Sequence, residues 1–257
     1  MVKESKEFYI DSDGISLHCK LDFPEKESNT GKYPLVILQH GLTGHMEEHH
    51  IVAAGETFRR NGCAVLRTEL YGHGKSGGNY KDHNVWKWVL ELVDVIDYAR
   101  KLDFVSELIL SGHSQGGLTV MLAAGIKSDC IRALIPLAPA LVIRDAARSG
   151  NLFGITFDPV NVPDEIGIKV KSLSGNYFRI NRYLPVEECV AIYKGPVLII
   201  HSDTDEAAPY RYSKDIVEKY ADAELVTIRN DTHCFDNHLD EMENAISTFI
   251  KRIYPDL

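Results

Sequence analysis

The sequence predicts an α/β fold in which a mostly parallel central sheet is flanked by helices. Two observations support this prediction. Short, β-branched apolar segments alternate with longer amphipathic segments, which is the pattern of crossover helices covering a parallel sheet. The chain has 257 residues, 44% of them hydrophobic and 25% charged, so it can bury the core of one domain of this kind. We therefore expect residues 1–257 to form a single domain.

Eight segments read as strands, and the first two of them as an opening hairpin. Between the later strands, one longer segment, residues 85–102, carries apolar side chains at helical spacing. This stripe is expected to pack on the sheet, and it consists of Val85, Trp88, Val89, Leu92, Val93, Ile96 and Ala99. The predicted strands are residues 8–10, 15–21, 35–39, 63–68, 108–111, 133–137, 197–201 and 225–228.

Residues 139–189 interrupt this alternation. They are rich in Gly, Pro and Asn, with weak periodicity and no clear strand–helix pair. A compact domain seldom keeps so long a loop without structure or function. We therefore predict that an inserted lid subdomain occupies this segment.

Charge and the amino terminus limit the partners and the location of the protein. The formal net charge of -9, from 28 basic and 37 acidic residues, leaves no basic surplus to neutralise phosphates, so nucleic acid is not an expected partner. Residues 1–7 are charged where a secretory signal needs an apolar run, and no segment approaches the roughly 18 apolar residues of a membrane span. We expect a cytoplasmic protein without a membrane segment.

The cysteines give no sign of a disulfide framework or a zinc site. The chain has five of them, an odd number, and they are far apart with no C-x-x-C pair. They are Cys19, Cys63, Cys130, Cys189 and Cys234. Mostly buried free thiols are therefore expected.

A candidate nucleophile lies between a strand and a helix. The sequence Gly112-His113-Ser114-Gln115-Gly116 follows the strand 108–111 and precedes a helical run over 118–124. A G-x-S-x-G motif in this context forms a sharp, strained turn, which projects the serine hydroxyl from the edge of the sheet. Ser114 is therefore the predicted nucleophile.

A serine hydroxyl needs a base, and the base needs an acceptor that orients it. Asp205 follows the strand 197–201, and His233 follows the last strand, which gives the chain order serine, acid, histidine. Asp203 competes with Asp205 and could instead fix the loop through its side chain. His238 competes with His233, but it lies near the start of the final helix, where a surface role is expected.

The negative charge that develops on an attacked carbonyl oxygen needs hydrogen-bond donors. The strand 35–39 runs into His40-Gly41-Leu42-Thr43-Gly44, a loop position that supplies one such donor, and the residue after the nucleophile supplies the other. The backbone N–H groups of Leu42 and Gln115 are therefore the predicted oxyanion hole.

One motif indicates a different chemistry. His45-Met46-Glu47-Glu48-His49 matches H-x-x-E-H, and on a helix its two histidines would share a face and could hold zinc. No third ligand is identifiable from spacing, and the segment directly follows the predicted oxyanion loop. Solvated or capping side chains are the simpler interpretation.

Taken together, these motifs resemble the α/β-hydrolase superfamily and, more narrowly, the bacterial cinnamoyl (feruloyl) esterases. The resemblance covers nearly the whole chain. It implies Ser114 as nucleophile, Asp205 and His233 as its partners, and Leu42 and Gln115 as oxyanion donors. The most selective matching segments are the H-G-x-T-G-H motif at residues 40–45 and the D-T-H-C motif at residues 231–234.

The resemblance also implies a lid over an aromatic acyl pocket. Asp145 and Tyr177 are candidates there for hydrogen bonds to a phenolic hydroxyl, with local capping and packing as the alternative. Where the family commonly has Gly-Asp before the acid loop, this chain has His201-Ser202-Asp203.

The function expected from the sequence is that of a serine carboxylesterase acting on small esters of hydroxycinnamic acids, with no cofactor and no metal. A monoacylglycerol lipase or a general short-chain carboxylesterase is the nearest alternative. A zinc peptidase and a receptor that binds an ester without turnover are alternatives from other classes. The expected partner is a small aromatic ester, and a homodimer is also considered.

Overall fold

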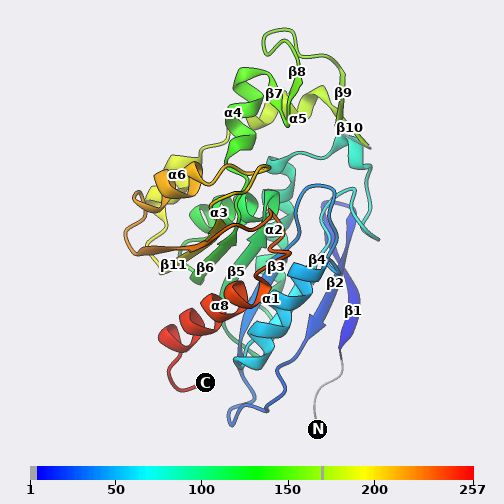
Figure 1. Cartoon of the computed structure of the whole chain (residues 1–257). Helices are drawn as coiled ribbons and strands as arrows, with labels where there is room; N and C mark the ends of the chain where they lie inside the picture. The colour runs from blue at the N-terminus through cyan, green and yellow to red at the C-terminus, as the bar shows by residue number, and fades with distance from the viewer. Residues whose placement is uncertain (1–4, 169–170) are drawn as a thin grey trace.

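The computed structural model describes residues 5–168 and 171–257, and over this part of the chain it confirms the predicted α/β fold (Figure 1). One sheet has the strand order β1-β2-β4-β3-β5-β6-β11-β12. β1 and β2 form the predicted antiparallel hairpin and β2 is antiparallel to β4, whereas the remaining neighbours are parallel. The strands are β1 (Lys6–Ser12), β2 (Ile15–Asp22), β3 (Tyr33–Gln39), β4 (Ala64–Thr68), β5 (Val105–His113), β6 (Ile131–Leu137), β11 (Val197–Ser202) and β12 (Ala223–Ile228).

Helices cover both faces of this sheet, which explains why the central strands are apolar throughout. Every residue of β3 is buried, and successive side chains alternate between the two faces. Val36 and Leu38 pack with α1 and α8, whereas Leu35 and Ile37 pack with α2 and α3. The helices that flank the sheet are α1 (His49–Arg60), α2 (Val85–Ala99), α3 (Gln115–Ile126), α7 (Arg211–Val217) and α8 (Leu239–Ile253).

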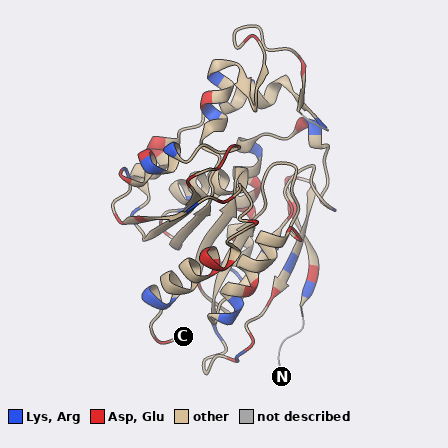
Figure 2. Ribbon diagram, viewed as in Figure 1, with Lys and Arg blue, Asp and Glu red and all other residues tan. Residues whose placement is uncertain are grey.

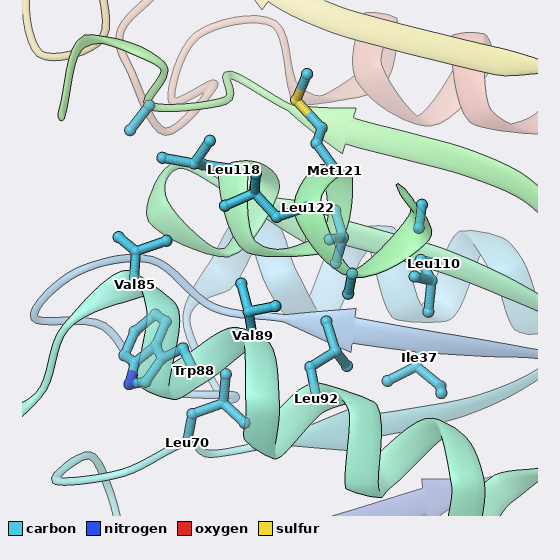
Figure 3. Close-up of a cluster of buried hydrophobic side chains, with 14 of the residues drawn as sticks. Ile37, Leu70, Val85, Trp88, Val89, Leu92, Leu110, Leu118, Met121 and Leu122 are labelled. Carbon is cyan, nitrogen blue, oxygen red and sulfur yellow. The ribbon is translucent and has the colours of Figure 1, made fainter. Parts of the chain in front are cut away.

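The predicted apolar stripe forms the buried face of α2. Figure 3 shows Val89 and Leu92 pointing toward α3 and toward Ile37 of β3, with Trp88 beside Leu70 at the start of the helix. The helix ends at Ala99, earlier than predicted, and Val95 is buried where Val93 had been expected, because Val93 lies at the half-buried margin of the stripe.

Residues 139–189 contain more secondary structure than their sequence indicated. Their described part holds short helices and two antiparallel ribbons, which stand beyond the sheet at the top of Figure 1. Elements this short show too few turns or alternations to produce a readable period. They are α4 (Val142–Ser149), β7 (Asn151–Leu152), β8 (Ile155–Thr156), β9 (Glu165–Ile168), β10 (Lys171–Ser174), α5 (Gly175–Asn181) and the start of α6 (Val186–Ile192).

Charged residues are distributed over many elements. Figure 2 shows Lys and Arg on separate helices and strands, with no basic stripe in that view. Within the described residues, no helix combines the length and apolar character needed to cross a membrane. All five cysteines are free; Cys19, Cys63 and Cys189 are buried, and Cys130 and Cys234 are partly exposed.

The joint between β5 and α3 requires close backbone packing. A Cβ atom on Gly116 would lie 2.3 Å from the carbonyl oxygen of His40, at the end of β3, and one on Gly112 would lie 2.6 Å from the carbonyl oxygen of Gly116. Neither distance is compatible with a side chain. The two glycines therefore allow the first turn of α3 to lie directly against the end of β3.

Seven histidines are buried in the described structure, and five of them, His40, His50, His73, His83 and His113, have a lowered pKa. Burial lowers the pKa of each, to about 3 for His40, His50 and His73, to about 4 for His83, and well below its ordinary value for His113. Glu91 behaves oppositely, because burial raises the pKa of its carboxyl to about 7. These groups are therefore neutral inside the fold under conditions in which they would be charged in an unfolded chain.

We predict that replacing Gly116 by alanine destabilises the fold by about 1–3 kcal/mol, because the added methyl group must displace backbone. The matched control is Gly167→Ala in β9, where an added Cβ meets nothing within 4 Å. Urea unfolding of both variants measures the difference. Equal stability of the two variants would show that the joint tolerates a side chain.

Stability should also fall in mild acid. Between about pH 6.5 and pH 4 the unfolded chain binds protons on these histidines and the folded chain does not, so each histidine contributes a loss as the pH drops. Glu91 offsets part of this loss between about pH 7 and pH 4.5, because there the folded state binds the extra proton.

The net expected result is a loss of several kcal/mol of unfolding free energy between pH 7 and pH 5, because the histidines outweigh Glu91; urea titration at each pH measures it. His73→Asn should reduce this pH dependence, because it removes one of the buried imidazoles. An unfolding free energy that stays constant from pH 7 to pH 5 would contradict the prediction that the buried histidines remain neutral in the folded protein.

Candidate active site

Ser114 occupies the tight turn between β5 and α3. Its backbone lies at φ 58° and ψ −121°, a strained conformation for a residue with a side chain. Two backbone hydrogen bonds hold the turn: the Ser114 N–H donates to the Leu137 carbonyl at 2.9 Å, and the Ala140 N–H donates to the Ser114 carbonyl at 2.9 Å. The predicted strand–turn–helix context of this serine is therefore present.

The structure brings the three predicted side chains into one hydrogen-bonded chain. The Nε2 atom of His233 lies 2.8 Å from the hydroxyl oxygen of Ser114, and its Nδ1 atom lies 2.5 Å from Oδ2 of Asp205. Because a carboxylate only accepts, Nδ1 carries the proton and Nε2 is free to accept the serine proton. The loops after β5, β11 and β12 position the three residues, and all three loops start at the carboxyl edge of the sheet because these strands are parallel.

The carboxylate of Asp205 is buried and has hydrogen bonds to both oxygens. Its Oδ1 accepts from the N–H groups of Ala207 and Ala208, each at 2.8 Å, and its Oδ2 accepts from His233 and from His201. Burial alone would raise the pKa of this carboxyl, but the hydrogen bonds from His201 and His233 hold the pKa well below its ordinary value. Asp205 is therefore a fixed negative charge facing His233.

The two competing residues take other positions. Asp203 accepts a hydrogen bond from the Asn230 N–H at 2.9 Å and thereby ties two loops together. His238 lies at the start of α8, where its N–H donates to Asp231 at 2.8 Å. Neither forms a hydrogen bond to Ser114 or His233 in the described structure.

His201 was not identified from the sequence as part of the site. Its Nε2–H faces two acceptors, the Ala208 carbonyl at 2.8 Å and Oδ2 of Asp205 at 3.1 Å, while its Nδ1 accepts from the Ser213 hydroxyl at 2.7 Å. The only sequence signal was the departure from the family's usual Gly-Asp at this point. The imidazole holds the aspartate in place through Oδ2, the same carboxylate oxygen that accepts from His233.

A second missed pair supports the backbone of His233. The Nε2–H of His113 donates to the His233 carbonyl at 2.8 Å, and the Nδ1 of His113 accepts from Nε2 of His50 at 3.1 Å. Because burial keeps both imidazoles neutral, they add no charge next to the base. Spacing in the sequence could not indicate this contact, since His50 and His113 come from distant segments.

The loop after β3 lies against the nucleophile. A Cβ on Gly41 would be 3.0 Å from the Ser114 Cβ, and the Gly44 N–H donates to the Gly41 carbonyl at 3.1 Å, which closes a turn around Leu42. Gln115 is the first residue of α3, so its N–H has no partner within the helix. This arrangement leaves both predicted oxyanion donors beside Ser114.

The two candidate substrate contacts lie apart from each other. Tyr177, in α5, is fully buried, and its hydroxyl donates to Oε1 of Gln115 at 2.7 Å. Asp145, in α4, accepts from the Tyr212 hydroxyl at 3.0 Å and lines a cavity of about 180 Å³, whose lining does not include Tyr177. Binding of a phenolic hydroxyl by this pair therefore stays a prediction.

The helical zinc motif predicted as an alternative is wrong. α1 begins at His49, so His45 lies in the preceding turn and the two histidines do not share a helical face. Glu48 accepts from the His45 N–H at 3.3 Å, and His49 pairs with Asp236 at 3.1 Å. The acidic and imidazole groups in this segment are used for turn formation and a surface ion pair.

Comparison with known proteins assigns the chain to a family. Residues 32–162 match the family model described as serine aminopeptidase, S33. Among solved structures, Est1E from Butyrivibrio proteoclasticus with ferulic acid bound is 48% identical, with a TM-score of 0.93 over 96% of this chain and 99% of that one.

More distant relatives match over most of the chain. The palmitoyl-protein thioesterase ABHD10 of Rattus norvegicus is 25% identical over 79% of this chain and 70% of its own length. A putative esterase/lipase of Haemophilus influenzae is 25% identical over 78% of this chain and 77% of its own length. The family match over half of the sequence and the near-complete structural match lead to one conclusion: the chain belongs to the serine aminopeptidase S33 family of α/β-hydrolases, and the α/β-hydrolase superfamily is the one that the sequence motifs predicted.

Proposed function

We propose that the protein is a serine carboxylesterase that hydrolyses small esters of hydroxycinnamic acids through an acyl-enzyme. The observation that carries the reaction type is the hydrogen-bonded chain from Ser114 through His233 to Asp205. The acyl preference rests on the similarity to Est1E, whose structure holds ferulic acid, the acid half of such an ester.

In the proposed first step, the Ser114 oxygen attacks the ester carbonyl while Nε2 of His233 takes the hydroxyl proton. Asp205 stabilises the imidazolium that forms, because its carboxylate faces Nδ1 at 2.5 Å. The carbonyl oxygen becomes negatively charged and is met by the N–H groups of Leu42 and Gln115. Each such donor contributes about 2.7–4 kcal/mol to transition-state stabilisation.

In the proposed second step, His233 gives its proton to the leaving alcohol, and the acyl group stays on Ser114. The same imidazole then accepts a proton from water, whose oxygen attacks the acyl carbonyl. The bond between the acyl carbon and the Ser114 oxygen breaks, His233 returns its proton to that oxygen, and the free acid is released. Protein groups supply the nucleophile, the base and the oxyanion donors, so these steps call for no cofactor.

The insertion at residues 139–189 is proposed as the lid of the acyl pocket. It is joined to the nucleophile turn by two hydrogen bonds, from the Ala140 N–H to the Ser114 carbonyl and from the Tyr177 hydroxyl to the Gln115 side chain. Asn181 also accepts from the Val85 N–H at 3.1 Å and thereby fixes the start of α2. The lid is therefore anchored at its base beside the reacting groups.

The cytoplasmic location and a homodimer both remain proposals. The alternatives within the hydrolases are a monoacylglycerol lipase and a general short-chain carboxylesterase. They differ from the proposed function in acyl preference, which a comparison of substrates can decide.

Replacing Ser114 by alanine should lower kcat/KM for ethyl ferulate by about 10⁴-fold or more, because the nucleophile is removed while the fold is kept. Ser149→Ala, at an exposed position of α4, is the control and should retain activity. Initial rates measured by loss of the cinnamoyl absorbance test both variants. A Ser114→Ala enzyme with most of its activity would disprove the assigned nucleophile.

A substrate panel tests the proposed acyl preference. We expect kcat/KM for methyl ferulate, p-coumarate and caffeate to exceed that for p-nitrophenyl butyrate and palmitate by about tenfold or more, after correction for the intrinsic reactivity of each ester. A preference for the long aliphatic ester would support the lipase alternative and reject the hydroxycinnamate assignment.

A further inference from the structure

Three metal-ligating side chains meet behind the proposed base. His50 comes from α1, His113 from the end of β5 and Cys234 from the loop after β12. One ligand atom from each of them lies within 4.8 Å of the others, and Nε2 of His50 and Nδ1 of His113 are 3.1 Å apart. Both histidines are buried and Cys234 is partly exposed, so the group opens to solvent on the cysteine side.

The two imidazoles can both act as ligands after one proton shift. Burial keeps both neutral, and neutral imidazole is the form that binds metal. The Nε2–H of His113 donates to the His233 carbonyl at 2.8 Å, so the lone pair on Nδ1 faces the cluster, where it accepts the Nε2–H of His50 at 3.1 Å. Metal binding moves the His50 proton from Nε2 to Nδ1, a buried atom without a hydrogen-bond partner in the described structure. Metal-binding histidines commonly donate their second N–H to a carbonyl in this way, because it fixes the tautomer and the ring orientation.

The spacing suits a small tetrahedral ion. Zinc bonds of about 2.0–2.1 Å to nitrogen imply a separation near 3.4 Å between two ligand nitrogens, close to the observed 3.1 Å. Zinc bonds of about 2.3 Å to sulfur call for a somewhat closer thiol than the 4.8 Å limit of the cluster. A rotation of the partly exposed Cys234 side chain can provide that approach.

The surroundings favour a cation. Oε2 of Glu48 lies 4.0 Å from Nε2 of His50 and is within reach as a fourth ligand. Burial and the nearby carboxylates of Glu48, Asp236 and Asp205 raise the pKa of the Cys234 thiol to about 12. The same carboxylates that disfavour a free thiolate attract a divalent cation, which offsets their charge.

We propose that this cluster binds a thiophilic divalent cation of the zinc class through His50, His113 and Cys234, with Glu48 completing the site. On binding, a sulfur–metal bond forms and the thiol proton is released to solvent. Bound metal reduces turnover, because Cys234 adjoins His233 in the chain and His113 holds the His233 carbonyl. The expected inhibition by bound metal rests on the proposed esterase function, whereas the proposed metal binding does not.

Cobalt(II) titration of chelator-treated protein tests binding without reference to activity. We expect about one equivalent of Co²⁺ to produce visible absorption of a tetrahedral ion and a near-ultraviolet thiolate-to-cobalt charge-transfer band. Cys234→Ser should lose the charge-transfer band, whereas Cys130→Ser, which removes another partly exposed thiol, should retain it. His50→Gln provides a second disruption and should weaken Co²⁺ binding by about 10-fold or more.

Zinc inhibition of ethyl ferulate hydrolysis tests the consequence. The Zn²⁺ concentration for half inhibition should rise about tenfold or more in Cys234→Ser and stay at the wild-type value in Cys130→Ser. Thermal unfolding of each variant without metal shows that the fold is retained. Equal inhibition of the wild type and Cys234→Ser would overturn the proposal, since the metal would then act elsewhere, for example on His233.

The two proposals fail in different ways. A Ser114→Ala protein that lacks esterase activity should still give the thiolate–cobalt band, because Ser114 is not a ligand. Absence of that band in a protein with full esterase activity would reject the metal site and leave the esterase function intact. A thiolate band in a wild-type protein without esterase activity would reject the function and leave the metal site intact.

Discussion

The strained turn at Ser114 is the constraint on which the rest of the site depends. A residue with a side chain at φ 58° is unfavourable, so the surrounding structure must stabilise that conformation. Its N–H and C=O groups are held by Leu137 and Ala140, and Gly116 lets α3 approach the end of β3. The same turn aims the hydroxyl at His233 and places the Gln115 N–H at the free end of a helix. The proposed nucleophile and one proposed oxyanion donor thus depend on a single backbone geometry.

A single buried charge organises the proton-transfer groups. Asp205 receives two backbone and two imidazole hydrogen bonds, and these maintain its negative charge in a site that water barely reaches. The supporting histidines, His50 and His113, are neutral, so they position His233 without competing for the carboxylate. This arrangement gives His233 one strong electrostatic partner, which favours protonation of that imidazole in the transition state.

Which features could be predicted from the sequence depends on how far apart the interacting residues lie along the chain. The strands, the turn at Ser114 and the order of acid and histidine are local patterns, and the geometry agrees with them. His201 and the pair of His50 and His113 were missed because their contacts join segments that only the tertiary fold brings together.

Predictions also failed where a short segment was assumed to be helical, or where the elements were too short to show a helical or strand period. The H-x-x-E-H motif was considered as a helical motif, but residues 45–48 form a turn, in which the Glu48 N–H donates to the His45 carbonyl at 3.3 Å, and α1 begins only at His49. In residues 139–189 the elements are too short to show a period, so only the presence of an insertion could be predicted.

Hydrogen bonds at the base of the insertion connect the proposed lid to the proposed catalytic groups. Tyr177 is fully buried and bonded to the side chain of Gln115, whose own N–H is the proposed oxyanion donor, and Ala140 is bonded to the nucleophile residue. A shift at the base of the insertion therefore changes the position of a proposed oxyanion donor and of Ser114. Phe153 and Val160, farther out in the insertion, are exposed, and no hydrogen bond joins them to Ser114 or Gln115 in the described structure. Under the proposed lid function, movement that admits substrate without disturbing the catalytic geometry is expected in this outer part.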